Sequence, residues 1–413
     1  MAGQEYQYIS DILKEFYTPA IINQLWKKSP LWAILKKKTQ DMVGKQIVTP
    51  VRVGLTEAVG ARAANDYTLP TAQRNLYDQS IITMKRMYGR VQVDGFSIEA
   101  AKGKGGWIDV LQGEIQGVTD AFTLDIDRQL MGGGQGVLGY CSAAISSQTV
   151  TVDTPGGIVD TTANTRFFRK GQVVDIFDSD MDPIHATAVQ ISLVTPSTST
   201  LTFVGTVSAV EDNDIIVKAN TSVAAAPESQ GELMGIDGLV GTGATPGATN
   251  FQGIPPGTET SWQSMVNTTG GVISELLIQQ DLDTIDNNTD GEAVDLLITS
   301  QTLRNKLLSL MQALRKIETV DFKAGWKALK YVGGDVELPI FTHKNCPAKY
   351  VYYLSRPHLT LWVLKNMVWD DKGGGVVKPV AGSDAYEAWF KLYANLGTDC
   401  RNAHGKCTNY TTA

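Results

Sequence analysis

The chain has 413 residues, of which 43% are hydrophobic and 19% charged, a composition typical of a globular protein with two or three domains. Its 36 basic and 43 acidic residues give a formal charge of -7, which argues against a nucleic-acid-binding surface that covers the whole chain. No apolar run is long enough to cross a bilayer and the first residues lack the pattern of a signal peptide, so we expect a protein that is made in the cytoplasm and not exported.

Residues 1–44 are expected to form an N-terminal arm of short helices. Apolar residues recur at helical spacing in this segment, but Pro19 and Pro30 interrupt the pattern and make a continuous core improbable. We therefore expect the arm to lie on another part of an assembly. A basic run near its end could contact nucleic-acid phosphates or form a solvated helix face, and we favour contacts with acidic patches of sister subunits over nucleic acid. This run consists of Lys36, Lys37 and Lys38.

Residues 45–95 are expected to form an extended loop built on a long two-stranded ribbon. Apolar residues alternate from Ile47 to Leu55, and a second extended run goes from Leu76 to Val93. The tip between these runs is rich in Ala, Gly and Arg and has no apolar stripe, so it needs a neighbour to cover it. The charged residues of the tip are candidates for contacts between subunits: Glu57, Arg62, Asp66 and Arg74.

A long helix is predicted from Trp107 to Met131, within residues 96–141. Apolar residues recur there at steps of three and four, which gives one apolar face over about 37 Å. Glycines at positions 132–134 stop the helix. Such a length is unusual in a globular protein, and we interpret the helix as a spine.

Residues 142–235 are predicted to form an inserted β module. Val, Ile and Thr dominate this region, and short strands alternate with turn residues, as in a small barrel or sandwich. Helical patterns return only after it, around residues 274–282 and 300–317, with a buried strand between them, so the host domain is expected to be α+β. The tail after Leu396 is polar enough to be loose.

Three runs resemble ligand-binding motifs but do not meet the requirements of those motifs. The GxGxxG run at 134–139 follows a helix and precedes a strand, the reverse of a nucleotide-binding fingerprint, and indicates a helix stop. The acidic runs at 286–291 and 178–182 lack the Glu that a calcium loop requires at its twelfth position, and indicate turns.

The chain offers few residues for catalysis or metal binding. It has four histidines and neither an HExxH nor a GxSxG motif, so we expect no enzyme, no catalytic residues and no cofactor. Its four cysteines are too scattered for a disulfide framework and are expected to be reduced. Cys400, His404 and Cys407 could supply three zinc ligands, but a structural zinc needs four, and we expect no metal site there.

The order of these segments resembles that of the major capsid proteins of tailed bacteriophages, the Hong Kong 97 fold. The resemblance rests on the arm, on the extended loop from Gln46 to Asp94 and on the spine helix GGWIDVLQGEIQGVTDAFTLDIDRQL. Further on, RKGQVVDIFD, DNDIIVKAN and GIDGLVGTG look like an inserted domain, and VDLLITSQTLRNKLLSLMQ looks like a strand and helix of an axial domain. The resemblance implies a peripheral domain with the spine helix at 96–141, the inserted β domain at 142–235, and an axial domain with the remaining peripheral strands at 236–413.

The resemblance also implies a function and partners. Such a chain forms the hexamers and pentamers of an icosahedral head that encloses double-stranded DNA without sequence-specific binding, in the virion, after assembly in the host cytoplasm. A portal is implied and a decoration protein is a further candidate. A separate scaffolding protein is expected because the chain opens directly into arm segments with no long charged coil. No membrane is involved.

Two other classes of protein fit parts of the pattern. An encapsulin-type compartment shares the family fold, but such shells usually lack a β insertion of this size. A glycan-binding or hydrolytic protein is supported only by the β module. Some family members also carry Lys to Asn isopeptide cross-links, which need a lysine on the extended loop. The tip here contains no lysine, so noncovalent cohesion is expected.

Overall fold

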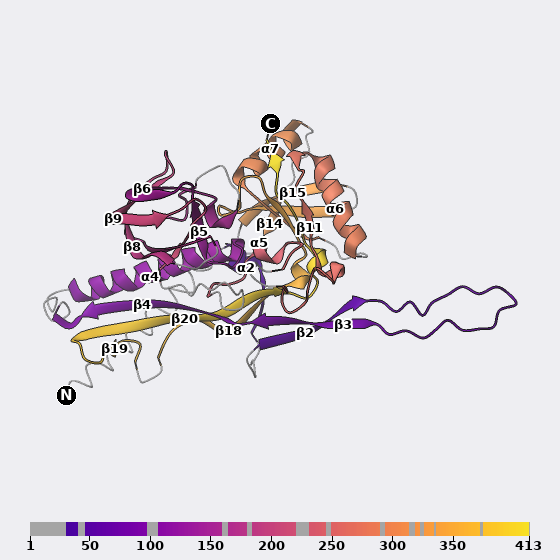
Figure 1. Ribbon diagram of the computed structural model, residues 1–413, viewed down its shortest axis with the longest axis horizontal. Helices are drawn as coiled ribbons and strands as arrows, with labels where there is room; N and C mark the ends of the chain where they lie inside the picture. Colours follow the sequence, from indigo (N-terminus) through magenta and orange to yellow (C-terminus); the bar gives the residue numbers. More distant parts are fainter. Residues whose placement is uncertain are drawn as a thin grey trace.

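The computed structural model describes residues 30–39, 46–96, 106–158, 164–179, 184–219, 231–244, 249–289, 294–313, 319–322, 326–333, 336–371 and 375–412. They form an α+β structure in which a long helix separates a sheet from a β-barrel, with a second sheet to one side and a long loop extending away (Figure 1). Among these residues, no helix is both long enough and apolar enough to cross a membrane.

The predicted spine helix is confirmed as α4 (Gly106–Met131), which lies along a five-stranded sheet (Figure 1). Its buried residues Ile115, Phe122, Ile126 and Leu130 follow the helical spacing, so they form one face. Phe122 packs edge-on against Phe390 of the sheet, with ring centroids 4.9 Å apart. The strands of this sheet are β1 (Lys36–Lys38), β18 (Leu359–Trp369), β20 (Ala385–Thr398), β19 (Lys378–Pro379) and β4 (Lys85–Asp94), of which β4 pairs with β20.

The close approach of α4 to the sheet depends on a glycine in β4. A Cβ atom added at Gly89 would lie 2.9 Å from the side chain of Val118 on the helix, closer than carbon atoms normally approach. The lack of a side chain at this position therefore lets the helix and the strand pack directly on each other.

The end of the predicted arm is part of the chain's own core, which corrects the expectation for residues 30–38. Helix α2 (Pro30–Ile34) packs against α4, and Leu31 and Trp32 are buried in the same cluster as the α4 residues. The lysine run is a strand, β1, parallel to β18, and not a helix face. The edge of β18 offers it unpaired backbone groups, which outweigh the local helical tendency. Residues 1–29 lie outside the described residues.

The ribbon is shorter than predicted. Strands β2 (Gln46–Gly54) and β3 (Leu76–Thr83) form the two-stranded ribbon, but the second extended run divides at Met84. After that break, β4 belongs to the five-stranded sheet, where Met87 and Val91 face the core. The sequence pattern is extended throughout, so it does not show that the chain changes partners.

The β module is a closed barrel in the order β10-β5-β6-β9-β8-β7. Its interior contains fully buried Val150, Val174, Ile191, Leu201 and Ile216. The barrel starts at β5, earlier than the predicted boundary at 142, because the same glycines that stop α4 lead directly into a strand. The strands are β5 (Val137–Cys141), β6 (Ile145–Asp153), β7 (Val173–Phe177), β8 (Ile184–Thr195), β9 (Thr200–Val210) and β10 (Ile215–Lys218).

The chain that returns from the barrel belongs to the main core. Residues 142–235 were expected to form the insertion, yet Leu233 is buried in the same cluster as the α4 residues, as are Ile236 and Leu239 of the short helix α5 (Ile236–Leu239). The barrel therefore closes at Lys218, before the predicted boundary at 235.

A fragment of residues 137–219 is expected to fold by itself, because the barrel is closed and has its own core cluster. Far-ultraviolet circular dichroism should show one cooperative thermal transition. The matched variant Val174→Asp, which places a charge in that core, should lose the transition. A random-coil spectrum of the unchanged fragment would contradict the prediction.

A seven-stranded sheet in the order β11-β21-β17-β13-β16-β15-β14 forms the third part, with α6 (Glu275–Thr289) and α7 (Gln301–Ala313) beside it (Figure 1). The predicted buried strand is β13, all of whose residues are buried. The strands are β11 (Met265–Asn267), β13 (Leu296–Thr299), β14 (Thr319–Phe322), β15 (Trp326–Gly333), β16 (Val336–Thr342), β17 (Val351–Leu354) and β21 (Gly405–Cys407).

The expectation of a loose tail after Leu396 is wrong. Strand β21 lies between β11 and β17, and β22 (Tyr410–Thr411) pairs with β12 (Gly271–Val272). The Arg401 guanidinium is buried, has no carboxylate partner among the described residues, and donates hydrogen bonds to the carbonyls of Leu239 and Gly243. Polar side chains of the tail are thus satisfied inside the fold, which composition cannot show.

Candidate intersubunit contact surface

The loop that joins β2 to β3 extends far from the rest of the chain (Figure 1). None of residues 58–74, all of which the structure describes, is buried. Large apolar side chains are fully open on it: Tyr67 is 91% exposed, Val59 88% and Leu69 87%. We name residues 55–75 the loop tip. A tip that exposes such side chains has apolar surface to bury against another molecule.

Local hydrogen bonds fix the shape of the loop tip. The Asp66 carboxylate accepts bonds from the hydroxyl of Thr68 at 2.6 Å and from its backbone N–H at 3.0 Å, and these bonds lower the pKa of Asp66. The Arg62 Nε donates to the Thr68 carbonyl at 2.9 Å. At the base of the tip, the backbone N–H of Thr56 donates to the Asn75 side-chain oxygen at 2.9 Å. The tip therefore has a turn geometry of its own before it meets a partner.

The charged residues that were predicted to make contacts between subunits lie in two separate regions of the structure. All four charged residues of the loop tip are exposed, and two of them, Arg62 and Asp66, lie 3.9 Å apart in the same chain. The lysine run lies elsewhere, on β1 at the edge of the five-stranded sheet. The structure thus pairs two of the tip charges with each other and keeps the lysines apart from them.

The lysines of β1 cover aromatic rings. The Lys37 Nζ lies 4.9 Å from the centroid of Trp32, and the Lys38 Nζ lies 4.8 Å from that of Trp362. Burial lowers the pKa of Lys37 to about 8. Lys36 is exposed. The run therefore contributes to packing within the chain as well as offering charge at its surface.

The motif-like runs have structural roles. Gly134 and Gly136 have positive φ angles of 79° and 82°, so the GxGxxG run ends α4 as predicted and feeds β5. Asp286 and Asn288 lie inside helix α6, so the predicted turn there is wrong; Asp290 and Gly291 lie outside the described residues. Of the run at 178–182, positions 180 and 182 also lie outside them.

The candidate zinc residues do not converge on a metal. His404 is fully buried, its Nδ1 accepts the backbone N–H of Ser355 at 3.2 Å, and its Nε2 bonds the Thr398 hydroxyl at 3.1 Å. Burial lowers the pKa of His404 to about 3 and raises that of Cys407 to about 11. The Cys400 thiol donates to Asn402. In the part of the chain that the structure describes, no three His, Cys, Asp or Glu residues are placed to hold a metal ion.

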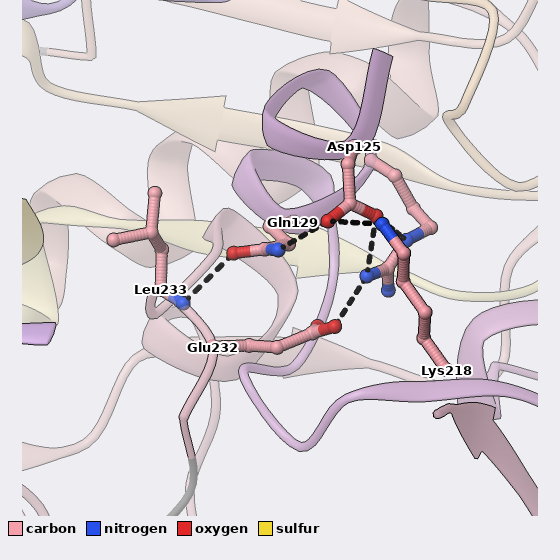
Figure 2. Close-up of polar contacts among 6 residues, drawn as sticks. Asp125, Gln129, Lys218, Glu232 and Leu233 are labelled. Carbon is pink, nitrogen blue, oxygen red and sulfur yellow. Dashed lines mark hydrogen bonds and ion pairs between the residues drawn. The ribbon is translucent and has the colours of Figure 1, made fainter. Parts of the chain in front are cut away.

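A polar cluster that the sequence pattern does not reveal joins the spine helix to the barrel and to the chain that returns from it (Figure 2). The Asp125 carboxylate lies 3.4 Å from Lys218 Nζ and accepts a bond from Gln129 at 2.9 Å. Gln129 in turn accepts the backbone N–H of Leu233 at 3.0 Å. We name this cluster the junction network, which consists of Asp125, Arg128, Gln129, Lys218 and Glu232.

Arg128 is the centre of the junction network. It forms ion pairs with Asp125, at 3.0 Å, and with Glu232, and both side chains of the second pair are almost fully buried. Burial alone would lower the pKa of Arg128, but the charges of Glu232 and Asp125 outweigh burial and raise it, so the guanidinium stays charged. Burial raises the pKa of Glu232 more than Arg128 lowers it. The network therefore holds three elements together at a considerable desolvation cost.

The chain is similar to a chain of the cyanophage A-1(L) capsid asymmetric unit, with a TM-score of 0.54 and 13% identity over 93% of each chain. The capsid of Myoviridae phage XM1 matches with a TM-score of 0.44, 8% identity and coverage of 92% and 90%. The holo-SrpI encapsulin complex from Synechococcus elongatus PCC 7942 matches with a TM-score of 0.45 and 8% identity, over 93% of this chain and 88% of the encapsulin chain.

No protein-family model and no curated protein sequence matches the chain. The similarity to the cyanophage A-1(L) capsid chain shows the fold of this chain, and it extends over nearly the whole of both chains. It confirms the α+β capsid fold that the order of the sequence segments predicts. The chain has the fold of the cyanophage A-1(L) capsid chain.

Proposed function

We propose that this chain is the major capsid protein of a tailed bacteriophage and that it assembles into an icosahedral head shell around double-stranded DNA. The observation that carries the proposal is the fold shared with the cyanophage capsid chain over 93% of both chains. The open loop tip supports it independently. None of the residues that the structure describes covers its apolar side chains Val59, Tyr67 and Leu69, and a closed lattice of identical copies would supply such cover.

We propose that the loop tip and β1 are contact surfaces of hexamers and pentamers. At the tip, burial of each exposed Val or Leu side chain by a neighbour would contribute about 1.5–3 kcal/mol, more than an exposed ion pair does. The charges of Glu57 and Arg74 would then set the register of the contact. Lys36, Lys37 and Lys38 would meet acidic patches of a sister subunit.

The remaining partners follow from the same proposal. A separate scaffolding protein and a portal act with the shell during assembly in the host cytoplasm, and a decoration protein is a candidate on the finished virion. DNA is enclosed without sequence-specific binding, which suits a subunit of net charge -7. The role is structural and not enzymatic.

Electron microscopy of the purified full-length protein tests the proposal. Closed shells are the expected result, and particles taken from their native source should contain nuclease-protected DNA. Shells that hold protein cargo and no DNA would assign the chain to an encapsulin-type compartment. A protein that stays monomeric under all assembly conditions would refute the shell function.

The shell is expected to be held by noncovalent contacts. The basic residues of the loop tip are Arg62 and Arg74, whose guanidinium groups stay protonated and cannot attack an Asn side chain. The described lysine nearest to the tip along the sequence, Lys85, lies in β4 of the five-stranded sheet, beyond the ribbon. Boiling mature particles in detergent with reductant should therefore release one band near 44.7 kDa. A ladder of covalent multimers would contradict this.

A further inference from the structure

A cleft of about 490 Å³ lies between the spine helix and the barrel. One wall is α4, including Leu124, Asp125 and Arg128, and the other is the barrel segment 166–172 with Lys218. Lys344, just after β16, also lines it. We name it the basic cleft. Both the helix and the barrel contribute walls, so an occupant would touch two parts of the fold together.

The charge of the basic cleft is opposite to that of the protein. Among the described residues that line it, six are cationic and one is a carboxylate, Asp125, which Arg128 and Lys218 already engage. Two further carboxylates do not line the cleft but contact cations that do: Glu232 forms an ion pair with Arg128, and Asp127 lies 3.6 Å from Lys344. Cations still outnumber carboxylates. The six are Arg128, Arg166, Arg169, Lys170, Lys218 and Lys344.

Several of these cations are available to a ligand. Arg169 and Lys170 are exposed at the rim, and the side chains of Lys344 and Lys218 are 50% and 43% exposed. A concave site with one sign of charge concentrates counter-charged ligands more than a flat surface does. The lining also includes apolar side chains, among them Leu124 and Phe167. The chemistry therefore fits an occupant that carries both carboxylate and apolar groups.

The size of the cleft favours a peptide over nucleic acid. Its volume is that of a site for a compact ligand, enough for a few residues of chain and too small to enclose a duplex. Single-stranded nucleic acid is bound on successive aromatic platforms. Phe167 is the one aromatic residue among the described lining residues, and the guanidinium of Arg166 lies over it at 4.9 Å from the ring centroid.

We propose that the basic cleft binds an acidic segment of a partner protein, with two or more carboxylates and an apolar side chain between them. The carboxylates pair with the cations at the rim, and the apolar side chain packs beside Phe167. Because the walls come from α4 and from the barrel, the bound segment fixes the barrel against the spine helix. This binding does not depend on shell assembly.

A labelled peptide tests the proposal on the full-length chain, kept below the concentration at which it assembles. The probe is a short fluorescein-labelled peptide of repeated Glu-Glu-Leu, measured by fluorescence anisotropy. Binding is expected, and the double variant R169E/K170E should weaken it by about tenfold or more. The control R86E reverses an exposed arginine on the face of β4 turned away from α4 and should change the affinity by less than about twofold.

Further variants and control peptides show whether the charges of the basic cleft cause the binding. The variant R169Q/K170Q should give an intermediate loss, and unchanged thermal unfolding of each variant shows that the fold is intact. The proposal is overturned if the Glu-Glu-Leu peptide does not bind, if R169E/K170E binds it as tightly as the original chain, or if a Gln-Gln-Leu peptide binds equally well. Tighter binding of oligothymidine, lost in R169E/K170E, would overturn it in favour of nucleic acid.

Discussion

A chain that lacks residues 58–74 is expected to stay a folded, soluble subunit and to form no shells. No residue of this segment is buried, and the deletion leaves four residues, Leu55, Thr56, Glu57 and Asn75, to join the paired ends of β2 and β3. The core therefore loses nothing, whereas the apolar surface that a neighbour would cover is gone. Electron microscopy should show no closed particles, and thermal unfolding of the subunit should match that of the full chain.

Two point-variant sets separate the forces at the loop tip. Replacing Val59, Tyr67 and Leu69 by Ser should block assembly nearly as well as the deletion, because it removes the exposed apolar groups. Replacing Arg62 and Asp66 by Ala should have a smaller effect, since these two charges already pair within the chain. Normal shells from the deleted chain would refute the role of the loop tip.

The elements that the sequence predicts well are those whose causes are local. The spine helix was expected from Trp107 and starts at Gly106, because the apolar residues at steps of three and four and the glycines after Met131 lie within the segment itself. The barrel was expected because its composition differs from that of the host. Its boundaries were less accurate, since β5 follows the helix stop without any change in composition.

The elements that the sequence predicts badly depend on distant partners. Lys36 to Lys38 form a strand because the edge of β18 lies beside them, more than three hundred positions later in the sequence. The tail looks loose because it is polar, but His404 is bonded to Ser355 and Thr398 inside the fold. Such pairings have no local signature, so neither hydrophobic period nor composition could reveal them.

The contact surface was predicted only in part. The sequence identifies the loop tip and its charges because the segment lacks an apolar period. It does not show that Val59, Tyr67 and Leu69 are all exposed to solvent. Three large apolar residues in a tip without a core could nevertheless have indicated an apolar contact surface. The junction network could not be predicted, because Arg128 and Glu232 are 104 positions apart.

The largest change in subunit stability is expected from Arg128→Met. This variant leaves the carboxylate of Glu232 buried without its partner and should lower the free energy of unfolding by about 3–5 kcal/mol. The double variant R128M/E232L should lose much less, because both buried charges are gone and Asp125 keeps its contacts with Lys218 and Gln129. Urea titration of the unassembled chain, analysed as a double-mutant cycle, measures the difference.

An ion pair whose side chains are about one third exposed supplies the matched control. The side chains of Arg356 and Asp295 are 34% and 32% exposed at a separation of 2.8 Å, so Arg356→Met should cost only about 0–1 kcal/mol. The contrast isolates burial as the cause, since both variants replace an arginine that pairs with a carboxylate. If the effects of R128M and E232L simply add in the double variant, Arg128 and Glu232 are not energetically coupled, and the junction network does not hold the barrel's return chain to the spine helix.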